Sequence, residues 1–319
     1  MGFPTTEHFA ASAPATERLA TLTQHISFSS DTGDRIDAQR IFHGRGHAWP
    51  GFEHLVIDLL PPLAVIGLFA PEDDIFINAL AHWLRQHIDA CEAVIRQQRY
   101  LATAPSNVLL GDMPETPLAV SENGLRFLVQ PGRNRNSGLF LDMRNGRDWV
   151  RRNSRGKRVL NLFAYTCGFS VAAVAGGAAS VVNIDMSSAA LSVGRGNHRR
   201  NDQPLDTVRF EKLDIFKSFG RIKRRGPYEL LICDPPTRQK GSVDIAKDYP
   251  RILRRLSEFM APASELLLCL NAPQLGRDFL LDAVARHAPQ YRFCADIPPP
   301  SVFADAQQRG LKVMHWRSR

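Results

Sequence analysis

Residues 159–170 combine an apolar strand, a tight turn and the start of a helix, and they constrain the fold more than any other stretch of the chain. The apolar run at residues 159–163 predicts a strand buried on both faces. Small and polar residues follow, and Gly168 then begins a helix rich in alanine. Open α/β sheets bind nucleotide-like ligands where a strand ends in such a turn at a helix N-terminus. We therefore expect a ligand pocket here, with later strands providing its other walls.

Strands and helices alternate through the rest of the chain. Apolar runs predict strands at residues 158–163, 180–185, 206–212, 229–233, 264–270, 290–296 and 311–316. Helical patterns lie between them at residues 168–177, 187–200, 244–259 and 275–287. Near-continuous apolar strands that alternate with helices are typical of a parallel, doubly wound sheet with helices on both faces. We therefore predict an α/β domain for residues 121–319.

The first part of the chain predicts a small α+β domain over residues 1–120. Residues 1–22 predict a loose or weakly helical lead-in. Short β-like runs follow at residues 25–29, 40–43, 54–60 and 63–69, and the last two are joined across Pro61-Pro62 as neighbouring strands. Apolar residues at helical spacing, including Cys91 and Ile95, predict one helix over residues 73–98. His43 and His47 stand in a glycine-rich segment without further ligands, so we expect a surface connection there and no metal site.

Charge and cysteine usage limit the class of protein. A formal net charge of +8 and a pI near 9.5 favour a polyanionic partner such as nucleic acid, although many basic proteins of this size have no such role. The five cysteines form no close pair, which argues against a zinc ribbon, a redox pair and a disulfide framework. We therefore expect a cytoplasmic protein. The N-terminus does not resemble a signal peptide and no apolar run reaches 18 residues, so we expect no secretion and no membrane span.

Polar residues follow four successive predicted strands, at the edge where such sheets bind ligands. They are the turn at residues 161–168, Asp185, Asp214 and Asp234. One acidic residue after a strand is commonly only a helix N-cap, but four positions in order predict one cavity. Asp185 is placed to accept hydrogen bonds from a ribose diol. Asp214 is placed to meet the amino edge of an adenine, although an N-cap is nearly as good an interpretation.

A nicotinamide dinucleotide is the main competing ligand, because it also uses an acidic residue after the second strand. That fingerprint needs Gly-x-Gly-x-x-Gly so that the backbone can approach a pyrophosphate. Here only Gly168 stands in the turn, and Tyr165 and Thr166 would crowd a pyrophosphate. A nucleoside without phosphates fits better, and S-adenosylmethionine (SAM) is a ligand of that kind.

Asp234-Pro235-Pro236 is interpreted as the edge that meets the methyl acceptor. Two prolines remove two N–H donors and fix the backbone, which leaves a rigid edge of carbonyls and one carboxylate. Such an edge suits a planar nitrogenous base held against the methyl donor. The alternative is that these residues only end a strand.

Three motifs resemble the class I SAM-dependent methyltransferases of bacterial large-subunit ribosomal RNA, in the group that holds the guanine-N7 and cytosine-C5 enzymes of 23S rRNA. They are Asn161-Leu-Phe-Ala-Tyr-Thr-Cys-Gly-Phe169, Ser137-Gly-Leu-Phe-Leu-Asp-Met-Arg144 and Asp234-Pro-Pro-Thr237. The resemblance covers residues 120–319 and, more loosely, residues 40–70. It implies a Rossmann-like sheet of seven strands with the last antiparallel, after a small α+β domain that helps to position RNA. It implies 23S rRNA as partner and leaves a homodimer open.

These interpretations assign the candidate site. The catalytic residues are Asp234, Pro235 and Pro236, and the cofactor-binding residues are Asn161, Phe163, Ala164, Tyr165, Thr166, Gly168, Asp185, Met186, Asp214, Ile215 and Asp234. Basic residues flank the predicted pocket and are candidates for phosphate contacts: Arg133, Arg135, Arg151, Arg152, Arg155, Lys157, Arg158, Arg195, Arg199, Arg200, Lys217, Arg221, Lys223, Arg224 and Arg225.

The chain departs from this group at positions that affect the target. Cys167 stands where a second glycine is usual, and Arg238 stands where the relatives have a base-stacking phenylalanine. Methylation at carbon 5 of cytosine needs a cysteine nucleophile just after the fifth strand, but Leu270 has that position and Cys269 comes one residue early. Asn271 resembles the guanine-N7 branch, so we favour methylation of a base nitrogen, which needs mainly positioning. Two alternatives stay open: a methyltransferase of a small molecule or protein, and an RNA-binding module without turnover.

Overall fold

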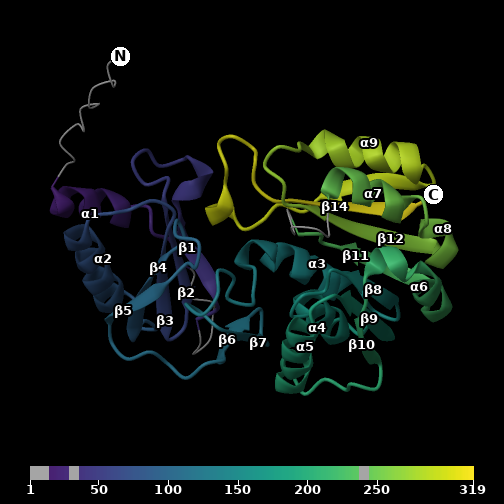
Figure 1. Ribbon diagram of the computed structural model, residues 1–319, viewed down its shortest axis with the longest axis horizontal. Helices are drawn as coiled ribbons and strands as arrows, with labels where there is room; N and C mark the ends of the chain where they lie inside the picture. Colours follow the sequence, from purple (N-terminus) through teal and green to yellow (C-terminus); the bar gives the residue numbers. More distant parts are fainter. Residues whose placement is uncertain (1–13, 29–35, 237–243) are drawn as a thin grey trace, which may run out of the picture.

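The computed structural model describes residues 14–28, 36–236 and 244–319. Figure 1 shows two halves side by side, the N-terminal one with a five-stranded sheet and the C-terminal one with a seven-stranded sheet. A hairpin of β6 (Leu118–Glu122) and β7 (Leu125–Val129) lies between them. The predicted fold class is confirmed, and the boundary that the sequence predicts at residue 120 would lie within β6.

The five-stranded sheet has the order β1-β2-β3-β4-β5, with β3 and β4 parallel and the other neighbours antiparallel. The elements of this half are α1 (Ala15–Thr23), β1 (Gln39–His43), η1 (Gly44–Gly46), β2 (Leu55–Leu60), β3 (Leu63–Leu68), α2 (Asp74–His87), β4 (Ala93–Gln98) and β5 (Ser106–Leu110). β2 and β3 form the expected hairpin across Pro61-Pro62. One face of the sheet packs on α1 and α2 and the other face packs on β6 and β7. Every residue of β2 and β3 is therefore buried.

The single helix predicted for residues 73–98 is wrong in its second half. α2 ends at His87, and residues 93–98 form β4 between β3 and β5. The spacing misled the prediction because residues four apart share a face in a strand as well as in a helix. Cys91 and Ile95 are both buried, as the helical pattern predicted. Ile95, however, is buried in β4, where it pairs with Val65 of β3.

The glycine-rich segment after β1 is less exposed than expected. Gly44 and Gly46 are buried in η1. A Cβ on Gly46 would lie 2.0 Å from the carbonyl oxygen of Ala304, which follows η4 (Ser301–Phe303) in the C-terminal half. The carbonyl of Gly46 also accepts a hydrogen bond from the N–H of Ala306 at 2.8 Å. The segment is therefore a close contact between the two halves, and only glycine fits there.

The seven-stranded sheet has the order β10-β9-β8-β11-β12-β14-β13. Its strands are β8 (Arg158–Leu162), β9 (Ser180–Asp185), β10 (Val208–Lys212), β11 (Tyr228–Cys233), β12 (Met260–Leu270), β13 (Tyr291–Asp296) and β14 (Lys312–Ser318). The first five strands in the spatial order are parallel. β14 is antiparallel to both of its neighbours, β12 and β13, so the expected last antiparallel strand is confirmed.

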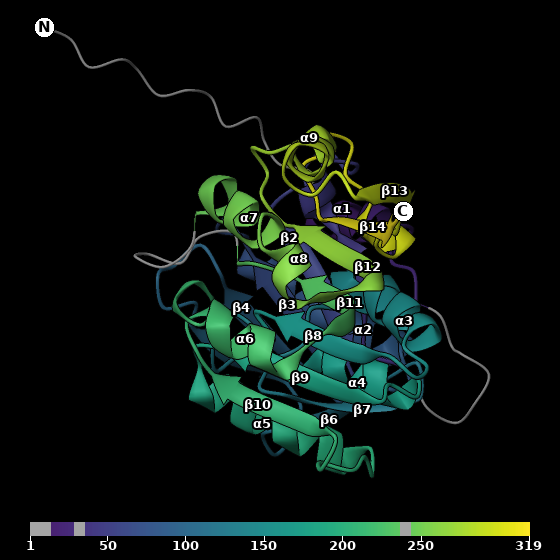
Figure 2. The same cartoon turned by 90° about the vertical axis from the view of Figure 1, so that its right-hand side faces the viewer.

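Helices cover both faces of this sheet, as predicted (Figure 2). One set comprises α3 (Arg144–Asn153), α4 (Gly168–Ala175) and α5 (Ser188–Arg200); the other comprises α6 (Phe219–Arg225), α7 (Ile245–Leu253), α8 (Leu256–Phe259) and α9 (Arg277–His287). Val159 of β8 packs in the first core and Leu160 in the second. Alternate residues of each strand thus fill two cores, which explains the near-continuous apolar runs.

Two helix predictions need correction in this half. The helix expected over residues 244–259 is divided into α7 and α8 at Arg254 and Arg255. The break lets Phe259 stack on Phe219 of α6, a helix that was not expected, with ring centroids 6.4 Å apart.

Within the three described ranges, no helix is both long and apolar enough to cross a membrane, and no metal-binding cluster of three or more side chains occurs.

Candidate active site

A cavity of about 560 Å³ opens at the carboxyl ends of the parallel strands. All the predicted catalytic residues and nearly all the predicted cofactor-binding residues line it: Phe163, Ala164, Tyr165, Thr166, Gly168, Asp185, Met186, Asp214, Ile215, Asp234, Pro235 and Pro236. They come from the ends of β8, β9, β10 and β11. The structure thus brings residues from Phe163 to Pro236 together at one edge of the sheet.

Asn161 is the predicted site residue that does not line the cavity. It is buried within β8, and its side-chain amide donates a hydrogen bond to Oδ1 of Asn183 at 2.9 Å. Asn183 donates in turn to Oγ of Ser170 at 2.9 Å, and Ser170 is hydrogen-bonded to Nε2 of His198 at 2.9 Å. Burial lowers the pKa of His198 to about 4, so its imidazole is neutral at pH 7. Asn161 therefore belongs to a buried polar chain behind the turn.

The turn after β8 has an unusual backbone. Phe163, Tyr165 and Cys167 have positive φ angles of 57°, 48° and 61°. Left-handed residues other than glycine cost about 1–3 kcal/mol each and cluster at functional sites. Neighbouring elements hold this conformation: the N–H of Tyr165 donates to Asp185 at 2.8 Å, and the Thr166 hydroxyl donates to the carbonyl of Gly138 at 2.6 Å.

The carboxylates after β9 and β10 hold the backbone and also face the cavity. One oxygen of Asp185 accepts from the N–H of Tyr165 and the other from that of Ser187, both at 2.8 Å. Asp214 accepts from the N–H of Phe216 at 2.9 Å and so caps η3 (Ile215–Lys217). An ionised carboxylate has about four lone-pair sites, so each retains acceptor capacity towards a ligand. Asp214 therefore caps η3 and also lines the cavity, so both interpretations of this residue hold.

A second pair of carboxyl groups faces the cavity near the end of β11. Asp234 follows β11, and Asp142 belongs to η2 (Leu141–Met143), just before α3. Desolvation raises the pKa of Asp234 to about 7; the nearby charge of Asp142 adds to this effect and Arg147 opposes it. Burial also raises the pKa of Asp142, against the attraction of Arg40 and Arg147. Asp234 therefore changes its charge near neutral pH.

The wall formed by residues 136–147 was not assigned to the site from the sequence. Its cavity-lining residues are Asn136, Gly138, Leu139, Phe140, Asp142, Met143 and Arg147. The apolar run within residues 137–142 predicts a short strand, but residues 137–140 are irregular and residues 141–143 form η2. Their motif carried the resemblance and was the available signal for this wall.

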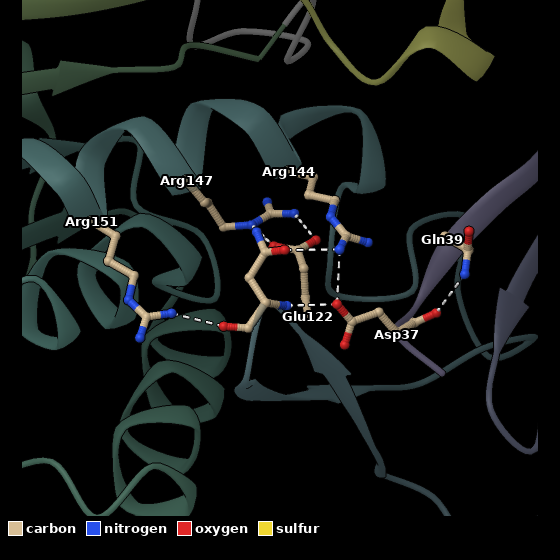
Figure 3. A network of polar contacts seen from close by, with 7 residues as sticks. Asp37, Gln39, Glu122, Arg144, Arg147 and Arg151 are labelled. Carbon is tan, nitrogen blue, oxygen red and sulfur yellow. Dashed lines mark hydrogen bonds and ion pairs between the residues drawn. The ribbon is translucent and has the colours of Figure 1, made fainter. Parts of the chain in front are cut away.

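Arg147 holds this wall from α3 (Figure 3). Its guanidinium donates to both oxygens of Glu122 at 2.7 and 2.6 Å and to the carbonyl of Phe140 at 2.9 Å. Arg147 is 5% exposed and Glu122 is 2% exposed, so the pair is shielded from water. The backbone of Phe140 is therefore held, while the residue as a whole is 39% exposed and lines the cavity.

Two further arginines of α3 connect the wall to the N-terminal half and to the β6–β7 hairpin (Figure 3). Arg144 donates to the carboxylate of Asp37, just before β1, at 2.8 Å. Arg151 donates to the carbonyl of Asn123, in the β6–β7 turn, at 2.7 Å. Because residues 144, 147 and 151 share one helix face, α3 binds the hairpin and the N-terminal half along its length.

The model of the S-adenosylmethionine-dependent methyltransferase family matches residues 39–317. The chain belongs to this family. The cofactor of this methyltransferase is SAM. Its sequence is 29% identical to "Ribosomal RNA large subunit methyltransferase I" of Erwinia tasmaniensis over 292 residues. The match covers 85% of this chain and 73% of the relative. The Serratia proteamaculans protein of the same name is also 29% identical, with the same coverage.

Solved structures share the fold of the methyltransferase. A protein described as a SAM-dependent methyltransferase from Streptococcus mutans superposes with a TM-score of 0.84 and 21% identity, over 97% of this chain and 82% of that one. The tRNA m1G37 methyltransferase of M. jannaschii superposes with a TM-score of 0.58 and 14% identity, over 82% of this chain and 72% of that one. Both support the Rossmann-like class I architecture.

No cysteine lines the cavity of the methyltransferase in the part of the chain that the structure describes. Cys167 and Cys269 are fully buried, and burial raises the pKa of both thiols well above the usual range. Both thiols are therefore neutral. Asn271, just beyond β12, lines the cavity instead, and Arg238 lies outside the described residues.

Proposed function

We propose that SAM lies along the turn after β8 and across the ends of β9 and β10. Phe163 to Thr166 and Gly168 form the floor of this part of the cavity. Asp185 accepts from the ribose hydroxyls, and Asp214 with Ile215 receives the adenine. The cavity lining supports this fit, because two carboxylates beside apolar side chains offer acceptors for the hydroxyl and amino groups of an adenosine moiety.

We propose that the methyl acceptor is a nucleobase held against Asp234, Pro235 and Pro236. Bound SAM supplies an electrophilic methyl group. The edge of residues 234–236 is rich in acceptors and orients the base through its N–H groups, and Asn271 faces the same space from just beyond β12. The observation that carries this proposal is the cavity lining: Asn271 is present at the base end and cysteine is absent among the described residues there. A ring nitrogen needs no covalent activation, so methylation of nitrogen is favoured over carbon 5.

We propose RNA of the large ribosomal subunit as the substrate. The relatives that share most of the chain are named for ribosomal RNA, and the net charge of +8 suits a polyanion. Exposed basic residues lie on the C-terminal half, among them Arg199, Arg200, Lys217, Lys223 and Arg224. The N-terminal half, tied to the cavity wall through α3, is proposed to position the RNA.

The test is transfer of tritium from labelled SAM to ribosomal RNA purified from a strain that lacks the gene. We expect label in the large-subunit RNA, and none in RNA from the parent strain, where the site is already methylated. Nucleoside digestion then identifies the labelled base, and a nitrogen-methylated base is expected. Label at carbon 5 would contradict the nitrogen assignment. Label found only in protein or small molecules would contradict RNA as the substrate.

A further inference from the structure

Tyr249 of α7 lies beneath the ends of two neighbouring strands and is 1% exposed. Its hydroxyl donates to the carbonyl of Cys233 at 3.0 Å, and it is also within hydrogen-bond distance of the carbonyl of Cys269. A hydroxyl has one proton, so the two carbonyls share a single donor. The ring packs edge-on against Phe279 of α9, with centroids 6.3 Å apart, which fixes the position of the hydroxyl.

Both carbonyls lie directly before the base end of the cavity. Cys233 ends β11 and precedes Asp234, and Cys269 is two residues before Asn271. Asp234 and Asn271 both line the cavity, whereas Tyr249 does not. β11 and β12 are parallel neighbours, so their chains leave the sheet side by side at this point. The Tyr249 hydroxyl thus joins the two places where the chain turns from sheet into cavity wall.

The edge formed by residues 234–236 is poor in backbone N–H donors. Pro235 and Pro236 have no N–H and so make no backbone hydrogen bond as donors. The helix that carries Tyr249 is fixed at its start, because the Asp244 side chain caps Ala246 and Asp248 accepts from the N–H of Asp244 at 2.8 Å. A well-anchored helix therefore holds an edge that is poor in donors.

We propose that Tyr249 is a positioning residue that sets the spacing between the Asp234–Pro236 edge and Asn271, and through it the orientation of the methyl-accepting base. This inference rests on the proposed function of that edge. In-line transfer needs near-attack geometry, and a displacement of about 1 Å can lower a rate on the order of a hundredfold. The effect of Tyr249 passes through the backbone of both strands.

The test compares Tyr249→Phe with Tyr228→Phe. Tyr228 lies at the opposite end of β11, is also 1% exposed, and donates its hydroxyl to the carbonyl of Ile222 at 3.2 Å. Each variant therefore loses one buried hydroxyl that binds backbone, and a general loss of stability should affect both. We expect kcat to fall about tenfold or more in Tyr249→Phe and less than about twofold in Tyr228→Phe, with the KM for RNA and the Kd for SAM little changed.

A second readout does not depend on the substrate. Hydrogen exchange at the backbone N–H groups of Asp234 and Asn271, measured with S-adenosylhomocysteine (SAH) present, should become faster in Tyr249→Phe and not in Tyr228→Phe. Equal kcat in the two variants, or unchanged exchange in Tyr249→Phe, overturns the proposal. If the wild-type protein transfers no methyl group to ribosomal RNA, the proposed function fails, and the exchange rates alone then decide whether Tyr249 holds the edge.

Discussion

Sγ of Cys167 lies 2.5 Å from the position that a Cβ on Gly194 would occupy. α5 approaches the turn after β8 this closely because residue 194 has no side chain. Cys167 itself has a positive φ and is fully buried, so the space for its thiol must come from a neighbour. The two residues form a matched pair: the chain has a side chain at 167, where the resemblance predicts glycine, and a glycine on the facing helix.

Gly194→Ala should destabilise the protein by about 1–3 kcal/mol, because the new methyl group overlaps the thiol. In a Cys167→Gly background both contacts under 3 Å disappear, so the same alanine should be neutral or stabilising by up to about 1 kcal/mol. Urea unfolding of the double-mutant cycle measures this coupling. Gly220→Ala in α6 is the control, since a Cβ there meets nothing within 4 Å. Additive effects at 167 and 194 would contradict the pairing.

Asp185→Ala should weaken SAH binding by about a hundredfold or more. The substitution removes the acceptor for the proposed ribose hydroxyls and also the acceptors for two N–H groups that shape the cavity. Asp206→Ala is the matched control, because Asp206 is exposed and accepts a hydrogen bond from the N–H of Thr207. Isothermal titration calorimetry gives both affinities. Wild-type affinity in Asp185→Ala would show that the cofactor does not contact this carboxylate.

SAM affinity should rise with pH near neutrality. Asp234 has a pKa of about 7, so the folded protein loses its proton and gains a negative charge in the cavity as the pH rises through that value. SAM carries a sulfonium cation and SAH does not, so the ionised carboxylate should favour SAM. We expect the ratio of the SAH Kd to the SAM Kd to increase about tenfold between pH 6 and pH 8, equal to about 1.4 kcal/mol.

The control for this pH effect is Asp234→Asn, which stays neutral over the whole range. Its affinity ratio should remain constant between the two pH values. If the ratio of the SAH Kd to the SAM Kd of the wild-type protein does not change with pH, the prediction is wrong. Asp234 then either titrates outside this range or lies far from the sulfonium.

Phe140→Ala should raise the KM for RNA about tenfold and leave the Kd for SAH within about twofold. The Phe140 ring is exposed beside Tyr165, with centroids 5.6 Å apart, on a backbone that Arg147 holds. An aromatic ring in such a place can stack on a base, an interaction of about 1–3 kcal/mol. Phe293→Ala is the control, since Phe293 is 37% exposed on β13. Steady-state kinetics with ribosomal RNA would contradict this role if the two variants behaved alike.

Arg147→Met should lower the free energy of unfolding by about 3–5 kcal/mol, because Glu122 would remain buried without its partner. Arg152→Met removes an arginine from the same helix, where the side chain is 69% exposed and pairs with Asp148. That change should cost less than about 0.5 kcal/mol. Urea unfolding of both variants separates the two cases, and equal losses would contradict the importance of the buried pair.

The seven-stranded sheet was predictable because its signals are local. Each apolar run is interpreted without knowledge of its partner, and β8 through β11 begin and end close to the predicted residues. The helix over residues 73–98 was not predictable in full, since the four-residue spacing of Cys91 and Ile95 satisfies both periodicities. The wall at residues 136–147 has no periodic pattern, so the motif at residues 137–144 was the one signal for it in the sequence.

The sequence by itself determined which polar residues end strands, and in a parallel sheet all such ends lie at one edge. That is why the sequence predicts Asp185, Asp214 and Asp234 at one cavity, which all three line. Tertiary packing alone decided that Asp142 lines the same cavity as Asp234 and that Cys167 meets Gly194. The same holds for the Tyr249 hydroxyl, which lies under two strand ends. These contacts depend on how separate elements dock, and no local pattern of residues records that geometry.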